Sequence, residues 1–522
     1  MDDIVAAVRE SLSPETRAEF VRRVERQAAD VAADAEAGRL DNADFALGIE
    51  LEAYVVDGEG RLERVPESVF EETDAGRELG VHNLELHTAP DTFDPAGLAR
   101  QADRLREAAA AVRAALPEGR RLVFDATPAV PPTEGSEAYL SAHDERDGVT
   151  VAHNMTRYDR YVALDNETLR RAAGHVPLSA PGVDRSFPTI LPESLTASLQ
   201  PHLQIPDAAT LPTYQAYALR TTGPVLALTA NSPFLPADLY GDADPEAALS
   251  GPHEHRIRVF EEAINAGLPT ERRKVRFPRD LAATGDAPGR VADDEPYAPV
   301  LEDGRGGDGG GSEYTDAYPE FDHARGTYWR WVRPVFGGDV PTGPDGDPAP
   351  DDDAASVRLE YRPLPTQPSV ADTLAVQALV AGLLRELVAT EHPLIDLPWA
   401  AARDAFYAAA ADGPNAALAW VAADGERTAD ADRIAAEVFE LAEGGLRRAG
   451  CSPDEAADLL APVVDRVDAA GPSAPWLTPS AWKRDRARER LDDGESLPSA
   501  VAGAQRAYLT RATDGEPFAS WA

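Results

Sequence analysis

The sequence predicts an α+β protein, and three patterns support that class. Short segments in which apolar and polar residues alternate, as in half-buried strands, recur through residues 1–365. Segments with the apolar spacing of amphipathic helices separate them. From Ser369 onward the pattern is almost entirely helical. Strands that alternate with helices and then give way to a helical tail are typical of the α+β class, and 522 residues are enough for more than one packed unit.

The first half of the chain opens with two charged amphipathic helices over residues 3–38. Ser13 and Pro14 supply the cap and the first turn of the second helix. Alternating segments then predict strands at 45–56, 81–89, 121–127 and 196–206. Helical spacing predicts helices at 95–115, 211–229 and 252–266.

The second half contains two segments with the composition of loops. Residues 284–320 carry GRGGDGGGSE, and residues 337–356 carry GGDVPTGPDGDPAPDDD. Both are rich in Gly, Pro and Asp and lack an apolar period. Short strands are expected between and after them, at 327–336 and 356–362. A helix capped by Ser369 follows at 369–390, and further Ala-rich helices continue towards the C-terminus.

Charge and composition narrow the range of partners and the compartment. The formal net charge is −41, and the only two lysines are Lys274 and Lys483. Acidic residues spread along the whole chain are typical of adaptation to a salt-rich cytoplasm, where ions screen self-repulsion. So negative a surface disfavours nucleic acid as a partner. The acidic start, without an apolar signal region, and the lack of a long apolar run predict a soluble cytoplasmic protein without a membrane span.

Four predicted strands each carry polar side chains on one face. In the first, Glu50 and Glu52 are two residues apart and point to the same side, while Leu51 points to the other. Glu is uncommon in strands, so two on one face require water, a cation or a basic partner. The polar faces of the other three strands are Asn83, Glu85 and His87; Gln200, His202 and Gln204; and Arg358, Glu360 and Arg362.

These strands would together give one sheet face four carboxylates and the imidazole of His202. Oxygen-rich sites with one nitrogen suit Mg²⁺ or Mn²⁺, and Mg²⁺ of this kind commonly serves substrate phosphates. Arg358 and Arg362 fit phosphate or carboxylate binding. For any single strand, a half-solvated face with ordinary ion pairs is the simpler explanation. The predicted metal ligands are Glu50, Glu52, Glu85, His202 and Glu360.

Three further segments add candidates for substrate binding. Arg333, in YWRWVRP, is a candidate ligand for a substrate carboxylate, whereas the neighbouring tryptophans fit core packing. Asn231 and Ser232 lie in a turn that ends a helix; the simpler explanation is a helix stop. Arg256 and Arg258 lie near the start of the helix at 252–266.

Two histidines and the single cysteine are not predicted to take part in metal binding or catalysis. His253 and His255 are expected to be exposed rather than ligands, and Cys451 fits a buried or surface thiol rather than a nucleophile. The chain contains no G-x-x-x-x-G-K-[ST] loop, no dinucleotide-binding glycine pattern and no G-x-S-x-G motif. Any handling of ATP would therefore depend on metal and arginine on an open sheet.

Seven short blocks now carry a resemblance to a known family. In order along the chain they are GIELEAYVVD, LELHTAPDTFD, HLQIPD, ALTANSPF, EHRIRVF, YWRWVRP and RLEYRPLPTQP. This order resembles that of the glutamate–cysteine ligase type 2 family of carboxylate–amine ligases. The resemblance covers residues 44–390. It implies a glutamine synthetase-like fold, in which an antiparallel sheet forms a bowl flanked by helices.

The resemblance also implies a reaction and roles for named residues. In this family ATP phosphorylates the γ-carboxylate of glutamate, and an amine attacks the acyl phosphate. By analogy, Glu50, Glu52, Glu85, His202 and Glu360 would bind Mg²⁺. Arg362 and Arg333 would act on the transferring group. The implied substrate- and ATP-binding residues are Arg256, Arg258, Asn231, Ser232, Arg358 and Gln200.

The resemblance divides the chain into three expected parts. These are N-terminal helices (1–43), a catalytic domain (44–390) with insertions at 284–320 and 337–356, and a C-terminal helical region (391–522). The expected partners are small molecules, glutamate and an amine, and the sequence leaves a homo-oligomer open. Two positions depart from the family pattern: Gln200 replaces a second histidine, and Pro365 replaces an aspartate. These two departures leave the identity of the amine substrate undetermined, and cysteine is the default amine.

The sequence supports two alternatives to a ligase. One is a non-catalytic relative that binds nucleotide or metal and docks a partner through its helical tail; the two departures favour it. The other is a metal-dependent phosphohydrolase that uses the same carboxylates.

Overall fold

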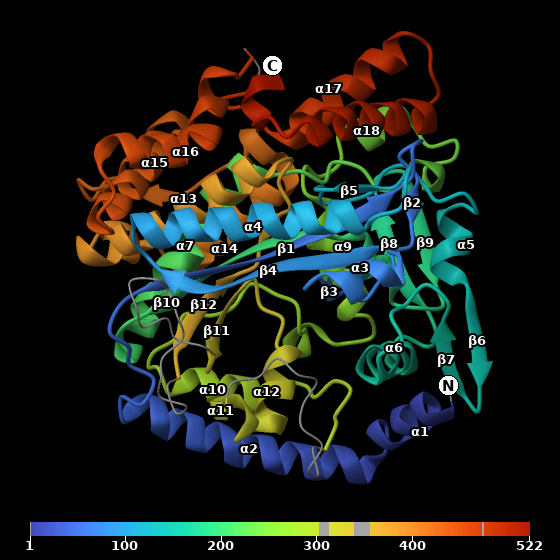
Figure 1. Ribbon diagram of the computed structural model, residues 1–522, viewed down its shortest axis with the longest axis horizontal. Coiled ribbons are helices and arrows are strands. Elements are labelled where there is room, and N and C mark those ends of the chain that lie inside the picture. Colours follow the sequence, from blue (N-terminus) through green and yellow to red (C-terminus); the bar gives the residue numbers. More distant parts are fainter. Residues whose placement is uncertain (1, 302–312, 339–354, 472–473, 522) are drawn as a thin grey trace.

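A curled antiparallel sheet forms the centre of the protein (Figure 1). The structure, a computed structural model, describes residues 2–301, 313–338, 355–471 and 474–521. Within these residues the sheet has nine strands, six of them in the order β11-β12-β10-β1-β4-β3. The strands are β1 (Ala46–Val56), β2 (Leu62–Glu63), β3 (Gly76–Arg77), β4 (Asn83–Thr92), β5 (Arg121–Val123), β10 (Ser198–Ile205), β11 (Val332–Phe336), β12 (Val357–Tyr361) and β13 (Leu364–Pro365). The predicted α+β class and sheet bowl are therefore confirmed.

The two faces of the sheet differ as the alternation predicts. Ile49, Leu51 and Ala53 of β1 are buried in the core. Helices α4 (Pro95–Ala115), α7 (Leu211–Thr229) and α13 (Val370–Ala389) contact the strands. The bounds of α4 and α7 are those predicted from helical spacing. The opposite face carries the charged residues of β1, β4, β10 and β12.

Strand β11 is shorter than its sequence pattern suggests. It begins at Val332, five residues after the predicted start at residue 327. Arg330 donates from Nη2 to Asp294 at 2.8 Å and from Nη1 to the Lys274 carbonyl. These contacts tie the segment to a neighbouring loop, so its regular pairing with β12 starts only beyond them.

The N-terminal helices α1 (Asp2–Ser11) and α2 (Pro14–Glu36) form as predicted, with Ser13 capping α2. Helix α2 runs along the edge of the molecule and contacts α10 (Asp286–Ala292) and α12 (Pro319–Gly326) (Figure 1). These helices, with the short α11 (Glu313–Asp316), correct the expectation that 284–320 is a loop. Ala287 and Val291 of α10 are buried, so tertiary packing stabilises a segment without a clear apolar period. The glycine-rich run 302–312 and most of the second predicted loop, 339–354, lie outside the described residues.

The remaining elements surround the sheet and its helices. Three hairpins are β6 (His143–Arg146) with β7 (Val149–Ala152), β8 (Val176–Ala180) with β9 (Val183–Phe187), and β14 (Trp420–Val421) with β15 (Arg427–Thr428). The other helices are α3 (Glu67–Glu72), α5 (Ser136–Ser141), α6 (Asp159–Arg171), α8 (Pro245–Leu249), α9 (His255–Ile264), α14 (Trp399–Asp412), α15 (Ala431–Arg448), α16 (Pro453–Asp468), α17 (Pro479–Asp492) and α18 (Leu497–Asp514). None of the helices in the described ranges has both the length and the hydropathy of a membrane span.

The C-terminal helices are joined to the rest of the protein by buried ion pairs. Arg466 of α16 lies 2.9 Å from Asp372 of α13, and both side chains are fully buried. Lys483 of α17 donates to Asp125, which follows β5, and to the backbone carbonyl of Asn231. Packing is therefore continuous across residue 390, and the predicted domain boundaries stay predictions.

Candidate active site

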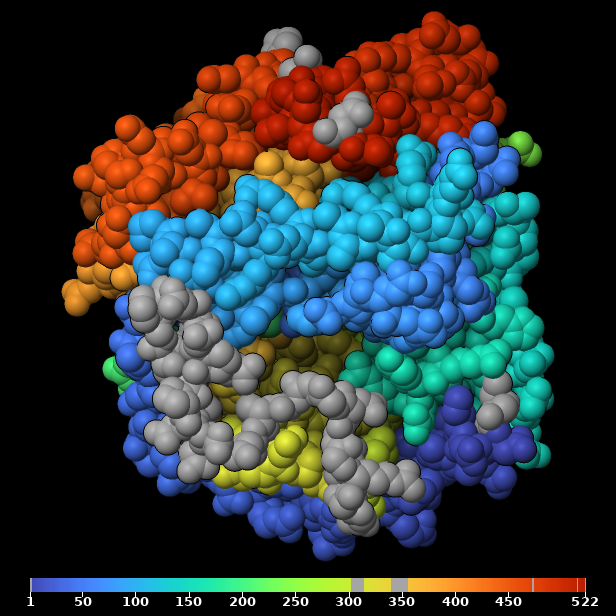
Figure 2. Space-filling view, in the orientation of Figure 1, coloured from blue at the N-terminus to red at the C-terminus, as the bar shows by residue number. Residues whose placement is uncertain are grey.

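The sheet gathers most of the predicted site residues on its polar face. β1 pairs with β4, which sets Glu52 opposite Glu85, and with β10, which sets Glu50 opposite Gln200. β10 pairs with β12, which sets His202 opposite Glu360. The space-filling view shows a hollow between α3 and α4 on one side and α12 on the other (Figure 2). Because side chains two residues apart share a face, this register brings the four polar strands together as the sequence predicted.

One half of the polar face consists of paired charges, centred on Glu360. Its two oxygens accept from Arg333 Nε at 2.8 Å and Arg333 Nη2 at 3.0 Å, and Arg362 Nη1 donates to the same carboxylate. Burial alone would raise the pKa of Glu360, but the two guanidinium groups outweigh it and hold that pKa well below its usual value. Burial lowers the pKa of Arg333 to about 10. Glu360 is thus an ionised anchor for two arginines.

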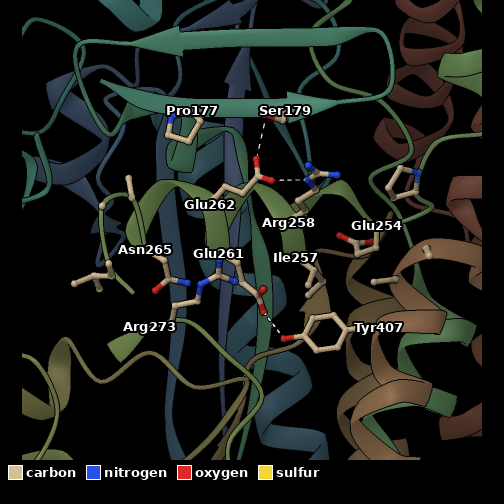
Figure 3. A pocket seen from close by; sticks show the side chains of 16 residues that line it. Pro177, Ser179, Glu254, Ile257, Arg258, Glu261, Glu262, Asn265, Arg273 and Tyr407 are labelled. Atoms are coloured by element: carbon tan, nitrogen blue, oxygen red, sulfur yellow. Dashed lines mark hydrogen bonds and ion pairs between the residues drawn. The ribbon is translucent and has the colours of Figure 1, made fainter. Parts of the chain in front are cut away.

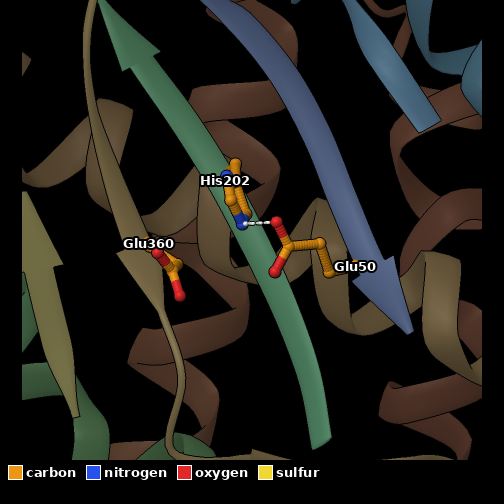
Figure 4. A group of neighbouring side chains, drawn as sticks. All are labelled: Glu50, His202 and Glu360. Atoms are coloured by element: carbon orange, nitrogen blue, oxygen red, sulfur yellow. Dashed lines mark ion pairs between the residues drawn. The ribbon is translucent and has the colours of Figure 1, made fainter. Parts of the chain in front are cut away.

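His202 lies between Glu50 and Arg358 in this paired half. Its Nε2 is 3.4 Å from Glu50 Oε1, and Glu360 lies on the next strand (Figure 4). Arg358 donates from Nε to His202 Nδ1 at 3.1 Å. A neutral imidazole that accepts at Nδ1 carries its proton on Nε2, so that nitrogen has no lone pair for a cation. Metal-bound histidines usually donate from the other ring nitrogen, which an arginine cannot accept.

The other half of the face holds carboxylates with few cations. Ligand oxygens of Glu52, Glu78 and Glu85 lie within 4.8 Å of one another. Burial, followed by repulsion from Glu52, raises the pKa of Glu78 to about 8. Burial and repulsion from Glu50 raise the pKa of Glu85 well above its usual value, and burial also raises the pKa of Glu52. The pKa of Glu193 is also raised well above its usual value, by burial and by the charge of Glu52. Glu193 therefore lies near these three carboxylates.

The two halves fit a divalent cation unequally. A cluster of hard oxygen ligands whose ionisation is suppressed by mutual repulsion suits Mg²⁺ or Mn²⁺. Glu360 and His202 already bind arginines, so they fit a cation less well than Glu52 and Glu85 do. The sequence-predicted ligand set is therefore split between the two halves.

Glu78 and Glu193 are the site residues that strand patterns missed. Glu78 lies between β3 and β4, and Glu193 lies in a short 3-10 helix, Leu191–Leu195. No strand alternation marks either position, and the acidic composition of the chain hides isolated glutamates. Only the tertiary fold brings them to Glu52.

Gln200 links the two halves of the face. Its amide nitrogen donates to Glu52 Oε1 at 3.1 Å, and its carbonyl oxygen accepts from Arg362. Ser198 adds a backbone donor to Glu52 at 2.8 Å and a hydroxyl donor at 2.9 Å. The charge of Arg362 also lowers the pKa of Glu52, Glu85 and Glu193 against burial, with Arg256 acting on Glu52 as well. Arg362 therefore lies at the junction between the paired and unpaired carboxylates.

Arg256, Asn231 and Ser232 form a buried network behind the site. Glu254 accepts from the Asn231 backbone at 2.8 Å and from the Ser232 hydroxyl, and lies 3.5 Å from Arg256 Nε. Arg256 also donates to the Pro363 carbonyl, next to Arg362. All three predicted substrate-binding side chains are buried and bonded to protein. Arg256 and Asn231 bind the segment that follows Arg362, through the carbonyls of Pro363 and Thr366.

Arg258 lies apart from the other predicted residues. Its side chain is exposed, and Nε donates to Glu262 at 2.6 Å on the outer side of α9.

The expectation that His253 and His255 are exposed is wrong: both are buried, and burial lowers the pKa of each to about 3. Trp331 is buried, as expected for core packing, and Cys451 is a free thiol in a buried position.

Comparison with known proteins places this arrangement in a class of ligases. The family model described as glutamate-cysteine ligase family 2 matches residues 46–502. The chain belongs to that family. The match extends past residue 390, where the motif resemblance ended, and so includes helices α14 to α17. No curated protein sequence matches.

Two solved structures are similar to the chain at low sequence identity. A bifunctional glutathione synthetase from Pasteurella multocida aligns with 13% identity and a TM-score of 0.49, covering 94% of this chain and 54% of that one. The present chain thus spans about half the length of that protein. A glutamate–cysteine ligase from Francisella tularensis in complex with AMP aligns with 12% identity and a TM-score of 0.41, covering 91% and 94% of the two chains.

Proposed function

We propose that this protein is an ATP- and Mg²⁺-dependent ligase that joins the γ-carboxylate of glutamate to an amine. The observation that carries the proposal is the division of the sheet face, with unpaired carboxylates on one side of Arg362 and anchored arginines on the other. Membership of glutamate-cysteine ligase family 2 supports the same conclusion. Cysteine is the default amine substrate. Because Gln200 stands where the family often has a histidine, a different amine is also compatible with the proposal.

The unpaired carboxylates are the residues that would hold the metal. Glu52, Glu78 and Glu85 offer oxygen ligands. Glu193 is near enough for the charge of Glu52 to raise its pKa. When bound there, Mg²⁺ neutralises the charge of the triphosphate. Glu50 and His202 border this region, and Arg358 keeps His202 in a hydrogen-bonded role.

The arginines supply the complementary positive charge. Glu360 fixes Arg333 and Arg362 side by side, so neither guanidinium needs to be ordered when a substrate arrives. Arginines held in this way stabilise negative charge on a transferring phosphoryl group. Arg256, through its contact with the Pro363 carbonyl, holds the backbone that follows Arg362.

The proposed reaction uses no protein nucleophile. A glutamate γ-carboxylate oxygen attacks the γ-phosphorus of ATP, the bond to ADP breaks, and an acyl phosphate forms. The amine nitrogen then attacks the acyl carbon, phosphate leaves, and the nitrogen loses a proton. The chain's task is to orient the reactants and exclude water from the acyl phosphate.

A product assay tests the proposal directly. The full chain is incubated at high salt with Mg²⁺, ATP, glutamate and a panel of amino acids and amines, and products are identified by mass. The expected result is a γ-glutamyl amide formed with one ADP and one phosphate, dependent on both glutamate and the amine. Phosphate release without an amide would instead identify a phosphohydrolase, and nucleotide binding without turnover a non-catalytic relative.

A further inference from the structure

A second cavity lies on the outer side of α9, away from the sheet face. Its volume is about 500 Å³, within the range of small-molecule sites. Helix α9 separates it from the site: Arg256 points to the Pro363 carbonyl, whereas Arg258, Glu261 and Glu262 line the cavity. Figure 3 shows Glu262 and Arg258 on one side of this α9 cavity and Glu261, Arg273 and Tyr407 on the other.

One pair of charges in the α9 cavity is already satisfied. Glu262 accepts from Arg258 Nε at 2.6 Å and from the Ser179 backbone N–H at 3.2 Å. These bonds use both carboxylate oxygens. The carboxylate of Glu262 therefore has no oxygen free to pair with a charged ligand, and it contributes only to the shape of the cavity wall.

Glu261 differs because its hydrogen bonds fall on one oxygen. Trp331 Nε1 and the Tyr407 hydroxyl both donate to Oε1 at 2.8 Å. Within the described part of the chain, Oε2 receives no hydrogen bond. The side chain is half-buried, and burial raises its pKa above the usual value. A carboxylate at a cavity wall with one oxygen free of donors can accept a hydrogen bond from a ligand.

Arg273 provides a free positive charge at the same side of the cavity. Its guanidinium is exposed, and no carboxylate among the described residues lies within ion-pair distance of it. The charge of Arg273 does act on Glu261, since it lowers the pKa of that carboxyl against burial. The two groups are thus neighbours that do not bind each other directly.

A carboxylate and a guanidinium at one cavity complement a ligand with an ammonium and a carboxylate. Ile257, Leu268 and Ala410 give the lining an apolar part for a side chain. We propose that the α9 cavity is a binding site for a small zwitterion, an amino acid or a dipeptide, with Glu261 contacting its ammonium and Arg273 its carboxylate. Glu254, which binds Ser232 and Arg256 behind the sheet face, also lines this cavity. Glu261 and Arg273 are not among the residues of the proposed ligase site, so the proposal stands whether or not the protein is a ligase.

Calorimetric titration of the full chain without nucleotide or divalent cation tests the proposal. The probes are L-leucine, L-glutamine and glycylleucine, with 3-methylbutylamine and 4-methylpentanoate as leucine analogues that carry only one charge. We expect saturable binding of at least one zwitterion and at least about tenfold weaker binding of either analogue, because each lacks one charged hydrogen bond.

Matched variants distinguish a binding role of Glu261 from a structural one. Glu261→Gln keeps an acceptor for Trp331 and Tyr407 but removes the charge, and Arg273→Ala alters an exposed side chain, so both should fold. Each should weaken zwitterion binding about tenfold or more. Arg272→Ala, next to Arg273 but outside the lining, is the control and should bind as the unmodified chain does.

Three outcomes would overturn the proposal. The first is no saturable binding of any of the three zwitterions. The second is equal affinity in Glu261→Gln, Arg273→Ala and the unmodified chain. The third is loss of binding in Arg362→Ala, which would place the ligand on the sheet face instead.

Discussion

The two halves of the polar sheet face contain the same residue type in opposite electrostatic states. Glu360 lies between Arg333 and Arg362, and their attraction holds its pKa well below the usual value. Glu78 and Glu85 lie among other carboxylates, and burial with repulsion raises their pKa values. The charges of the paired half thus neutralise one another, whereas the carboxylates of the unpaired half are the ones that a cation would stabilise. Variants that act on one half alone can separate these roles.

The largest effect is expected for Arg362, which joins the halves. In Arg362→Ala, kcat/KM for amide formation should fall about 10³-fold, because no other described guanidinium contacts both Gln200 and Glu360. Product formation by mass and phosphate release measure it. Activity within threefold of the unmodified chain would remove Arg362 from the mechanism.

A change in the paired half should mainly reduce stability. Glu360→Gln leaves the buried guanidinium of Arg333 without its charge partner, which should cost about 3–5 kcal/mol in the free energy of unfolding. Denaturant unfolding at high salt and pH 7.5 measures it. A loss below about 1 kcal/mol would show that Arg333 finds another partner.

The unpaired half should make stability depend on pH when divalent cations are removed. The pKa of Glu78 is about 8 in the folded protein, against an ordinary value of 4.5 that applies to the unfolded chain, so the folded protein keeps this proton as pH rises between those values. The folded state then binds more protons than the unfolded state. Stability therefore falls as pH rises from about 5 to 8, by at most about 1.4 kcal/mol per pH unit for this group.

Unfolding in a chelator at several pH values checks this dependence. Glu78→Gln cannot titrate at this position, so its stability profile should be flatter over the same range. Added Mg²⁺ should abolish the fall, because a bound cation favours the ionised carboxylates. Identical slopes in both proteins would contradict the assigned pKa.

A smaller, opposite change in stability is expected for Glu85→Gln. Glutamine is neutral without the proton that burial and repulsion force Glu85 to bind on folding, so the substitution should raise the free energy of unfolding by about 1 kcal/mol without divalent cations. The stabilisation that Mg²⁺ gives the unmodified chain should shrink in the variant. Thermal unfolding with and without Mg²⁺ measures both quantities, and a destabilised variant that keeps its full response to Mg²⁺ would argue against a cation at Glu85.

Arg258→Ala should have the smallest effect on the ligase reaction. Its guanidinium pairs with Glu262 on the outer side of α9, at an exposed position where an ion pair contributes little. We expect kcat/KM within about twofold of the unmodified chain, within the usual context dependence of surface substitutions. The same assay as for Arg362→Ala measures it. A loss comparable with that of Arg362→Ala would mean that Arg258 reaches the substrate during turnover.

Much of the fold could be predicted because alternation and helical spacing are local properties. The bounds of α4 and α7 follow from their spacing alone, and the polar faces of β1, β4, β10 and β12 follow from their period of two. Helix α10 was missed because its stability comes from contacts with α2 rather than from its own pattern. The burial of His253 and His255 was missed for a similar reason: helices from distant parts of the chain cover them.

The sequence by itself determined which side chains share a strand face: Glu50 with Glu52, and Arg358 with Glu360 and Arg362. It also determined membership of the ligase family, through motifs in a fixed order. Only the tertiary structure decided which charges neutralise each other. The pairing of β11 with β12 places Arg333 beside Glu360, so that the two form an ion pair. Two segments outside the strands place Glu78 and Glu193 near Glu52. Electrostatic interactions depend on distance in space, and residues 333 and 360, or 52 and 193, become neighbours only when the sheet forms.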